Sequence, residues 1–300
     1  MGWRSIIISH PSKLSVKDNQ LIIDQEEKWS MPIEDIASVV IENPQTLITM
    51  KTLELLSNCN VTLYICDNRH IPIGYLLPYY QHSRQLKVIN QQLSQTEPFK
   101  KRLWQQIIKQ KIKNQAYVLM CIGKRDISDK LERMSEKVDS GDTLNIEAEV
   151  AKIYFETIYE RNFNRNYENI YNACLDYGYS ILRGAIARNI AKYGYIPSLG
   201  IHHKSELNNY NLADDIIEPF RPIVDLWVVE NIKSDMEFTK EIRGGLVDLL
   251  NYDVIIENKR QCVSNAINIM ISSYTTAIQM KDYSKISLPK VVPLERHEYE

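Results

Sequence analysis

One glutamate in the segment 143–163 lies where a charged side chain is unfavourable. On a helical wheel with about 100° per residue, Glu147 falls in the apolar stripe that holds Tyr154, Phe155 and Ile158. A carboxylate that points into a protein core needs a cation, a metal ion or strong hydrogen-bond donors. The pattern leaves three interpretations of Glu147 open: a first-turn acid at the start of a helix, one half of a buried salt bridge, or a metal ligand.

A second group of side chains suited to metal binding follows further along the chain. His202 and His203 are adjacent, and Asp215 and Glu218 lie downstream. A spacing of three residues places the two carboxylates on one side of a helical turn. Imidazole and carboxylate groups together form a plausible ligand set for a divalent metal. The same residue types also occur as ordinary surface or core polarity, so composition alone supports both interpretations.

Basic residues are concentrated in one part of an otherwise slightly acidic chain. The net charge is −2, whereas the segment 84–133 contains twelve basic and four acidic residues. A local positive field of this size can neutralise the phosphates of a nucleic acid. A solvated helix face is the alternative explanation for the same charges.

The elements that must position these groups change in character near residue 81. Short runs rich in Val and Ile, bounded by turn residues, predict strands over 5–9, 21–24, 37–42, 61–66 and 71–77, with a helix over 46–58. After Pro98 the spacing is helical, because Trp104, Ile108 and Ile112 recur every four residues. A second long helix is predicted over 172–193, with Gly194 as its C-terminal cap.

The sequence therefore predicts an α+β protein with a small β-rich domain followed by a larger all-α domain. The expected divisions are a β-rich domain over 1–82, a linker over 83–98, a helical catalytic domain over 99–286 and a tail over 287–300. The tail, which contains Pro289 and Pro293, is expected to be extended or mobile.

Cysteine usage and hydropathy argue against several classes of protein. The five cysteines are widely spaced and form no C-x-x-C motif, which disfavours both a disulfide framework and a zinc–cysteine site. The chain has no H-E-x-x-H motif, so a zinc hydrolase is set aside. No apolar run approaches the roughly 18 residues that span a membrane, and no secretory signal is evident. We expect a cytoplasmic protein without a membrane segment.

Four motifs occur in an order that resembles a known family. They are Glu147-Ala148-x-x-Ala151-x-x-Tyr154-Phe155, Asn172-x-x-x-x-Tyr177-Gly178-Tyr179, Gly200-x-His202-His203 and Asp215-x-x-Glu218-Pro219-Phe220-Arg221-Pro222. In this order they resemble the CRISPR-associated integrase and endonuclease of spacer acquisition, the universal adaptation nuclease family. The likeness is closest to type II members, which share Gly2-Trp3-Arg4 and Pro78-Tyr79-Tyr80. Relatives often have Gly where this chain has Ala148, and many carry Asp in place of Glu218.

This resemblance implies a set of catalytic residues and a metal. Glu147, His203 and Glu218 match the family's three metal ligands, for which Mg²⁺ or Mn²⁺ is the expected cofactor. Asp215 matches an acid one turn before the third ligand, and Tyr177 matches a tyrosine near the active site of relatives. His202 is expected to be a neighbour of the site and not a ligand.

The implied function is DNA strand transfer, in which a 3′-hydroxyl of a captured fragment attacks a phosphodiester at a CRISPR repeat. The implied partners are double-stranded DNA, a second copy of the chain joined through the β-rich domain, and a small second adaptation subunit. Arg221 is equally open to a role as partner of a buried acid. The candidate DNA contacts are Arg84, Lys101, Arg102, Lys109, Arg183, Arg188 and Arg221.

Two other functions are compatible with the same residues. The first is a metal-dependent nuclease for branched or repair DNA, which would use the same ligands. The second is a non-catalytic DNA-binding scaffold, in which Glu147, His203 and Glu218 form a structural ion-pair network.

Overall fold

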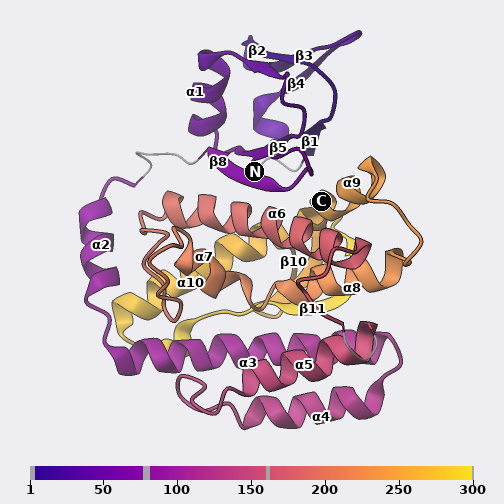
Figure 1. Ribbon diagram of the computed structural model, residues 1–300. Helices are drawn as coiled ribbons and strands as arrows, with labels where there is room; N and C mark the ends of the chain where they lie inside the picture. Colours follow the sequence, from indigo (N-terminus) through magenta and orange to yellow (C-terminus); the bar gives the residue numbers. More distant parts are fainter. Residues whose placement is uncertain (1–3, 77–81, 160–162, 299–300) are drawn as a thin grey trace.

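Two small sheets and one helix form the N-terminal part of the chain, at the top of Figure 1. The computed structural model describes residues 4–76, 82–159 and 163–298. One sheet has the strand order β1-β5-β7-β8 and the other β4-β3-β2-β6. The elements are β1 (Arg4–Ile8), β2 (Lys13–Lys17), β3 (Gln20–Asp24), β4 (Lys28–Pro32), β5 (Ile36–Ile41), β6 (Leu47–Ile48), α1 (Met50–Asn58), β7 (Thr62–Cys66) and β8 (Pro72–Leu76).

A separate hydrophobic core holds these sheets together. Leu14, Leu21, Val39 and Leu63 come from four different strands and are buried in the same cluster. In β2 and β3 strand alternation turns Leu14 and Leu21 inward while their neighbours are partly or fully exposed. Strands β5 and β7 are buried on both faces, because Val40 and Tyr64 belong to the main core of the helical region.

The five predicted strands are confirmed within a residue or two at their ends. The strands β2 and β4 were missed because β2 is mostly polar and β4 contains neither Val nor Ile. The helix predicted over 46–58 begins only at Met50, because Leu47 and Ile48 pair with β2 as the short strand β6.

The rest of the chain is mostly helical, and the long helix α3 crosses its lower part in Figure 1, with α5 and α4 drawn below it. The α+β order of the fold is therefore confirmed. The elements are α2 (Gln85–Leu93), α3 (Glu97–Cys121), α4 (Arg125–Glu136), α5 (Ile146–Tyr159), α6 (Ile170–Lys192), α7 (Asn211–Ile217), α8 (Arg221–Asn231), α9 (Lys240–Asp248), β9 (Tyr252–Ile256), β10 (Lys259–Cys262), α10 (Val263–Met280) and β11 (Lys290–Arg296).

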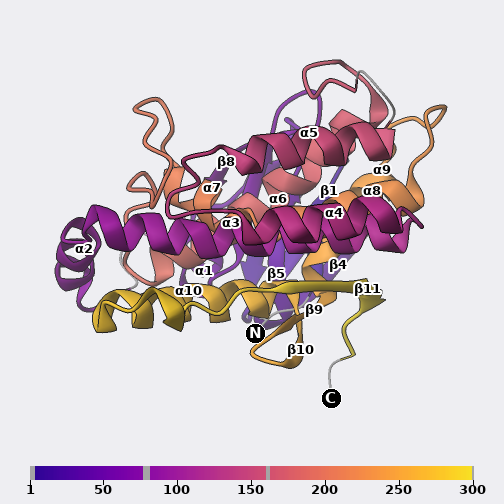
Figure 2. The same cartoon turned by 90° about the horizontal axis from the view of Figure 1, so that it is seen from below.

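Two details of the prediction need correction. The segment predicted as a linker contains the helix α2, and the C-terminal region is not all α, because β10, β9 and β11 form an antiparallel sheet. The tail is extended, as expected, but it is held in place. Asn114 of α3 donates to the carbonyl of Pro289 at 3.0 Å and accepts from the amide of Val291 at 3.2 Å. Figure 2 shows β11 running beside α3.

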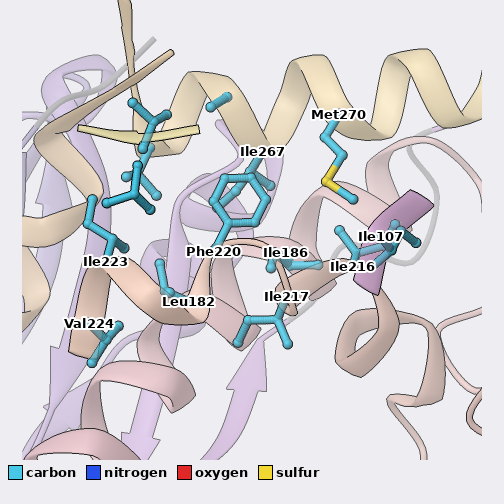
Figure 3. Close-up of a cluster of buried hydrophobic side chains, with 14 of the residues drawn as sticks. Ile107, Leu182, Ile186, Ile216, Ile217, Phe220, Ile223, Val224, Ile267 and Met270 are labelled. Carbon is cyan, nitrogen blue, oxygen red and sulfur yellow. The ribbon is translucent and has the colours of Figure 1, made fainter. Parts of the chain in front are cut away.

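The main core lies where α6 meets α7, α8 and α10. Figure 3 shows Phe220 between Ile267 of α10 and Leu182 of α6, with Ile217 and Ile223 on either side of it along the chain. Phe220 is buried, as are its neighbours in this cluster. Burying a side chain of this size contributes about 1.5–3 kcal/mol relative to leaving it exposed. This packing holds the turn between α7 and α8, on which the third candidate ligand lies.

Some expectations concern residues outside the described ranges. Gly2-Trp3 and Pro78-Tyr79-Tyr80, which contributed to the type II resemblance, belong to them. Within the described part of the chain, no helix is both long enough and apolar enough to cross a membrane.

Candidate metal centre

Two of the three candidate ligands meet at a single lysine. The Nζ atom of Lys111 lies 2.5 Å from Oε1 of Glu147 and 2.5 Å from Oε2 of Glu218. These glutamates are far apart in the sequence, and the lysine belongs to α3. Burial alone would lower the pKa of Lys111, but the charges of Glu218 and Glu147 outweigh it and raise this pKa. The three side chains therefore form a charged group in which the ammonium bridges both carboxylates.

Glu147 lies in the first turn of α5, where the partial positive charge of the helix N-terminus favours an acid. Asp142 stabilises this turn, because its carboxylate accepts hydrogen bonds from the backbone amides of Ile146 at 2.9 Å and Glu147 at 3.0 Å. The Glu147 side chain is 27% exposed. Both structural interpretations of Glu147 thus hold at once, since it is a first-turn acid and a salt-bridge partner of Lys111.

Glu218 occupies the tight connection between α7 and α8 and is buried. Its second charge partner is Arg221, whose Nε lies 3.0 Å from Oε1. Burial works to raise the pKa of Glu218, but Arg221 and Lys111 outweigh that effect and lower the pKa to about 2. The carboxylate is consequently ionised at neutral pH, which a metal ligand requires.

Asp215 holds the histidine loop in place from one turn before Glu218. Its buried carboxylate accepts from the amides of Ile201 at 2.5 Å, His202 at 3.1 Å and His203 at 3.1 Å. The same carboxylate lies 2.7 Å from Nδ1 of His203, and this hydrogen bond raises the pKa of that imidazole. A carboxylate bound to one ring nitrogen orients the imidazole and leaves Nε2 as the nitrogen for a ligand.

Gly200 is required for this arrangement. A Cβ atom added at this position would lie 2.3 Å from the carbonyl oxygen of His203 and 2.8 Å from Oδ2 of Asp215. Any larger residue would push the loop off the carboxylate that holds it. His202 takes a different position from its neighbour, because its ring stacks on the buried Trp104 with ring centroids 4.3 Å apart. That contact agrees with its expected role as a neighbour of the site.

A cavity of about 660 Å³ opens beside these residues, and Lys111, His203 and Glu218 all line it. Its walls combine three arginines from separate segments with acids that pair with them, since Arg165 binds Asp176, Arg183 binds Asp214 and Arg221 binds Glu218. The ring of Tyr179 also lines the cavity, and the Arg221 guanidinium lies 4.6 Å from its centroid. Arginine forks of this kind suit the planar, bidentate recognition of phosphate oxygens.

Some candidates lie elsewhere in the structure. The hydroxyl of Tyr177 donates to Glu42 at 3.4 Å, and Tyr177 is not among the residues that line the cavity. Arg188 is buried and donates to the carbonyls of Ala37 and Asn60 in the β-rich region. Arg188 therefore connects the helical region to the β-rich region, and its buried guanidinium is not accessible to DNA.

The remaining basic candidates lie mainly on the exposed part of α3 and at the start of α2. The Nζ atom of Lys109 lies 3.5 Å from Oε2 of Glu136 on α4. The Cζ atom of the Arg102 guanidinium lies 5.5 Å from the ring centroid of Tyr283. Lys101 and Arg84 are exposed. These positions permit contact with a phosphate backbone, which remains a prediction for all four residues.

The sequence interpretation did not single out Lys111, Arg165, Tyr179 and Asp225, all of which line the cavity. A signal existed for Lys111. It follows Trp104, Ile107 and Ile108 at helical spacing, so it lies in the apolar stripe of α3. The test that identified Glu147 as an inward-pointing acid would have identified Lys111 as an inward-pointing base. No comparable pattern marks Arg165, which lies in an irregular segment.

Asp225 of α8 is a buried acid at the wall of this cavity. It accepts hydrogen bonds from the hydroxyls of Tyr154, at 3.0 Å, and Tyr179. Burial is the largest influence and, despite these two donors, raises the pKa of the Asp225 carboxyl from 3.8 to about 6. Between these two values the folded protein retains a proton that the unfolded chain has lost. The free energy of unfolding therefore falls as the pH rises through this window.

Asp225→Asn is expected to remove this pH-dependent contribution. A shift of about two pKa units corresponds to about 3 kcal/mol. The free energy of unfolding of the variant, relative to the wild type, should thus increase by about 3 kcal/mol from about pH 3.5 to about pH 8. Urea denaturation at several pH values measures this difference. A difference that stays constant with pH would show that Asp225 titrates as it does in the unfolded chain.

The residues present fit a divalent cation. Oε2 of Glu218 is buried and has no hydrogen-bond partner of acceptable geometry among the described residues, although the Lys111 ammonium lies close to it. Two carboxylates and one imidazole form a donor set that Mn²⁺ accepts, and Mg²⁺ accepts its oxygens. Within the described ranges, no cluster of three or more His, Cys, Asp or Glu side chains has the spacing of a ready metal site. The Lys111 ammonium lies between two of the candidate ligands, Glu147 and Glu218.

Comparison with protein families gives a match over most of the chain. The profile of the family described as CRISPR associated protein Cas1 matches residues 6–244. A protein named CRISPR-associated endonuclease Cas1 from Neisseria meningitidis serogroup C (strain 8013) is 42% identical over 304 residues, which cover 100% of both chains. The match thus includes the β-rich region and all four motifs.

Solved structures share the fold of this chain. A casposase bound to integration product superposes with a TM-score of 0.76 at 21% identity, covering 94% of this chain and 93% of that chain. A chain of a Cas6-RT-Cas1–Cas2 complex gives a TM-score of 0.73 at 18% identity, covering 96% of this chain and 36% of that chain. At such identities the likeness establishes the fold.

Proposed function

Because the chain belongs to the Cas1 family of CRISPR-associated endonucleases, we propose that it is a metal-dependent DNA strand transferase that inserts captured fragments into a CRISPR array. The observation that carries this proposal is the meeting of Glu147 and Glu218 at one cation position beside a cavity lined by three arginines. His203, which is held by Asp215, lines the same cavity. Glu147, Glu218 and His203 are the proposed metal ligands.

Each residue of the proposed site has a task in this reaction. A bound Mg²⁺ or Mn²⁺ would supply Lewis acidity to the attacking 3′-hydroxyl and to the phosphoryl oxygens. Arg221 keeps Glu218 ionised and buried, and Asp215 orients His203 through Nδ1. The guanidinium groups of Arg165 and Arg183 line the cavity at positions suited to hold the scissile phosphate and its neighbours. The attacking DNA end is itself the nucleophile, so no protein nucleophile is needed.

The proposed partners follow from the family and from the named relatives. The substrate is double-stranded DNA, both as captured fragment and as repeat. The chain is proposed to act as a homodimer joined through its β-rich region, in a larger assembly with a small second adaptation subunit. It is proposed to work in the cytoplasm, where its DNA substrates are found.

A strand-transfer assay tests this function. The protein, with and without the small subunit, receives a short duplex with free 3′-hydroxyls and a supercoiled plasmid that carries a CRISPR repeat, in Mn²⁺, Mg²⁺ or EDTA. Joining at the repeat that requires metal is the expected result. Cutting without joining would favour the nuclease for branched or repair DNA, and DNA binding without either reaction would contradict an enzymatic role.

One observation favours a second candidate function. Lys111 and Arg221 already neutralise Glu147 and Glu218, as expected for a structural ion-pair network in a non-catalytic DNA-binding scaffold. A non-catalytic scaffold predicts neither joining nor cutting in any arm of the assay, and DNA binding that EDTA leaves unchanged. The EDTA arm of the same assay therefore separates the two candidates.

A further inference from the structure

Lys111 occupies a position that no motif of the sequence assigns. Its side chain is 11% exposed, and its Nζ atom lies 2.5 Å from an oxygen of each glutamate. The second positive charge of the group is that of Arg221, which binds the other oxygen of Glu218 at 3.0 Å. Two basic and two acidic side chains thus balance each other without a metal. A lysine is buried in this way only where anionic partners compensate for its lost hydration.

We propose that Lys111 is a resident counter-cation, which holds Glu147 and Glu218 together until a divalent metal displaces it, and which then binds a phosphate of the DNA. This inference rests on the proposed function, because it takes the two glutamates to be metal ligands. It adds a regulatory property to that site. Metal binding and DNA binding become coupled through the movement of one side chain.

Electrostatics require the displacement. A divalent ion bound to Glu147 and Glu218 would lie close to the place that the Lys111 ammonium occupies, and like charges at such a distance repel strongly in a site of low dielectric. Adding two positive charges to a group that is already neutral leaves it with an excess of positive charge. A phosphate of DNA restores the balance, so the site binds its metal best when DNA is present.

Lys111 has a place to which it can move. It lines the cavity beside Arg165, Arg183 and Arg221, which pair there with Asp176, Asp214 and Glu218. A phosphate in this cavity would compete with those acids for the guanidinium groups, and the Lys111 ammonium, once displaced from the glutamates, would be free to bind it. A lysine carries its charge on a flexible four-carbon stem, so its ammonium can turn into the cavity while the helix stays still. Arg221 is less free to move, because its guanidinium lies 4.6 Å from the ring centroid of Tyr179 and also binds Glu218.

The first test measures metal affinity without DNA and without turnover. Electron paramagnetic resonance of free Mn²⁺ gives the affinity of the wild type and of Lys111→Met, which keeps the length of the side chain and removes its charge. We expect Lys111→Met to bind Mn²⁺ about tenfold more tightly, within the range typical of coupled sites. Lys113→Met is the matched control on the same helix, because Lys113 pairs with Glu136 outside the site. Its Mn²⁺ affinity should equal that of the wild type.

The second test adds a short duplex, with the Mn²⁺ bound by the duplex alone subtracted. We expect the duplex to raise the Mn²⁺ affinity of the wild type about tenfold more than it raises that of Lys111→Met. By reciprocity, Mn²⁺ should strengthen duplex binding more in the wild type than in the variant. Equal effects of the duplex on both proteins would overturn the coupling through Lys111.

Two further variants separate the possible failures. Glu218→Gln removes a ligand and should abolish specific Mn²⁺ binding; wild-type affinity in this variant would contradict the metal centre itself. If Glu218→Gln loses Mn²⁺ but Lys111→Met binds it no more tightly than the wild type, only the counter-cation proposal fails. Thermal unfolding identifies a variant that is not folded. In that case Lys111→Gln, which can still donate hydrogen bonds without a charge, replaces Lys111→Met with the same expected result.

Discussion

Glu147→Ala, His203→Ala and Glu218→Gln are each expected to lower the rate of DNA strand transfer by about a thousandfold or more. Each change removes one of three proposed metal ligands, and the loss corresponds to about 4 kcal/mol of transition-state stabilisation. The variants should still form the proposed homodimer, because none of these side chains belongs to the β-rich region through which the two copies are proposed to join. Strand transfer into a repeat plasmid measures the rate, and size-exclusion chromatography measures the assembly.

Glu149→Ala is the matched control for this experiment. Glu149 lies in the same first turn of α5 as Glu147, but its side chain is exposed on the solvent face. It should retain strand transfer close to that of the wild type. Full activity in Glu147→Ala, His203→Ala or Glu218→Gln would remove that residue from the site, and equal losses in Glu149→Ala would point to a general effect of acidic charge on α5.

Arg243→Met is expected to lower the free energy of unfolding by about 3–5 kcal/mol, the usual cost of leaving a buried charge without its partner. Arg243 of α9 binds Glu42 at the end of β5 through two hydrogen bonds of 2.7 and 3.0 Å. Both side chains are buried. The pair joins the β-rich region to the helical region, so its loss should weaken the contact between them. Urea denaturation followed by circular dichroism measures the change.

Arg260→Met is the control, because Arg260 also pairs with two acids but its side chain is 53% exposed. An exposed pair contributes about 0–1 kcal/mol, so a small effect is expected there. The double variant Glu42→Leu with Arg243→Met removes both buried charges and should recover part of the stability lost in Arg243→Met alone. A loss in Arg243→Met no larger than that in Arg260→Met would contradict the buried pair.

Local patterns in the sequence were sufficient for most of the secondary structure. Short runs rich in Val and Ile, bounded by turn residues, identified five strands, and the apolar spacing of α3 and α6 identified both long helices. Gly194 adopts the positive φ of 79° expected of a C-terminal cap. The sheet of β9, β10 and β11 was missed, because β11 is held by Asn114 of α3 and by pairing with β9, which are contacts between distant parts of the chain.

The same distinction applies to the candidate site. The inward position of Glu147 and the spacing of Asp215 and Glu218 could be found from helical periodicity, and the ordered motifs indicated the family, which is confirmed. Tyr177 belongs to one of the motifs and Arg188 follows it on α6, but both point toward the β-rich region, where they meet Glu42 and the carbonyl of Ala37. The motifs alone therefore did not show which side chains of α6 face the cavity and which face the β-rich region.

The sequence by itself determined the class of fold, because that depends on residue type and on spacing within single elements. Four motifs in order indicated the family, and the resemblance to that family supplied the three proposed ligands. Only the tertiary structure brought Lys111 of α3 between Glu147 of α5 and Glu218 after α7, and placed Arg165, Arg183 and Arg221 around one cavity. The physical reason is that charge pairing acts through space. A charged residue within an apolar stripe shows that a partner is needed, but only the packing of one helix against another decides which residue that partner is.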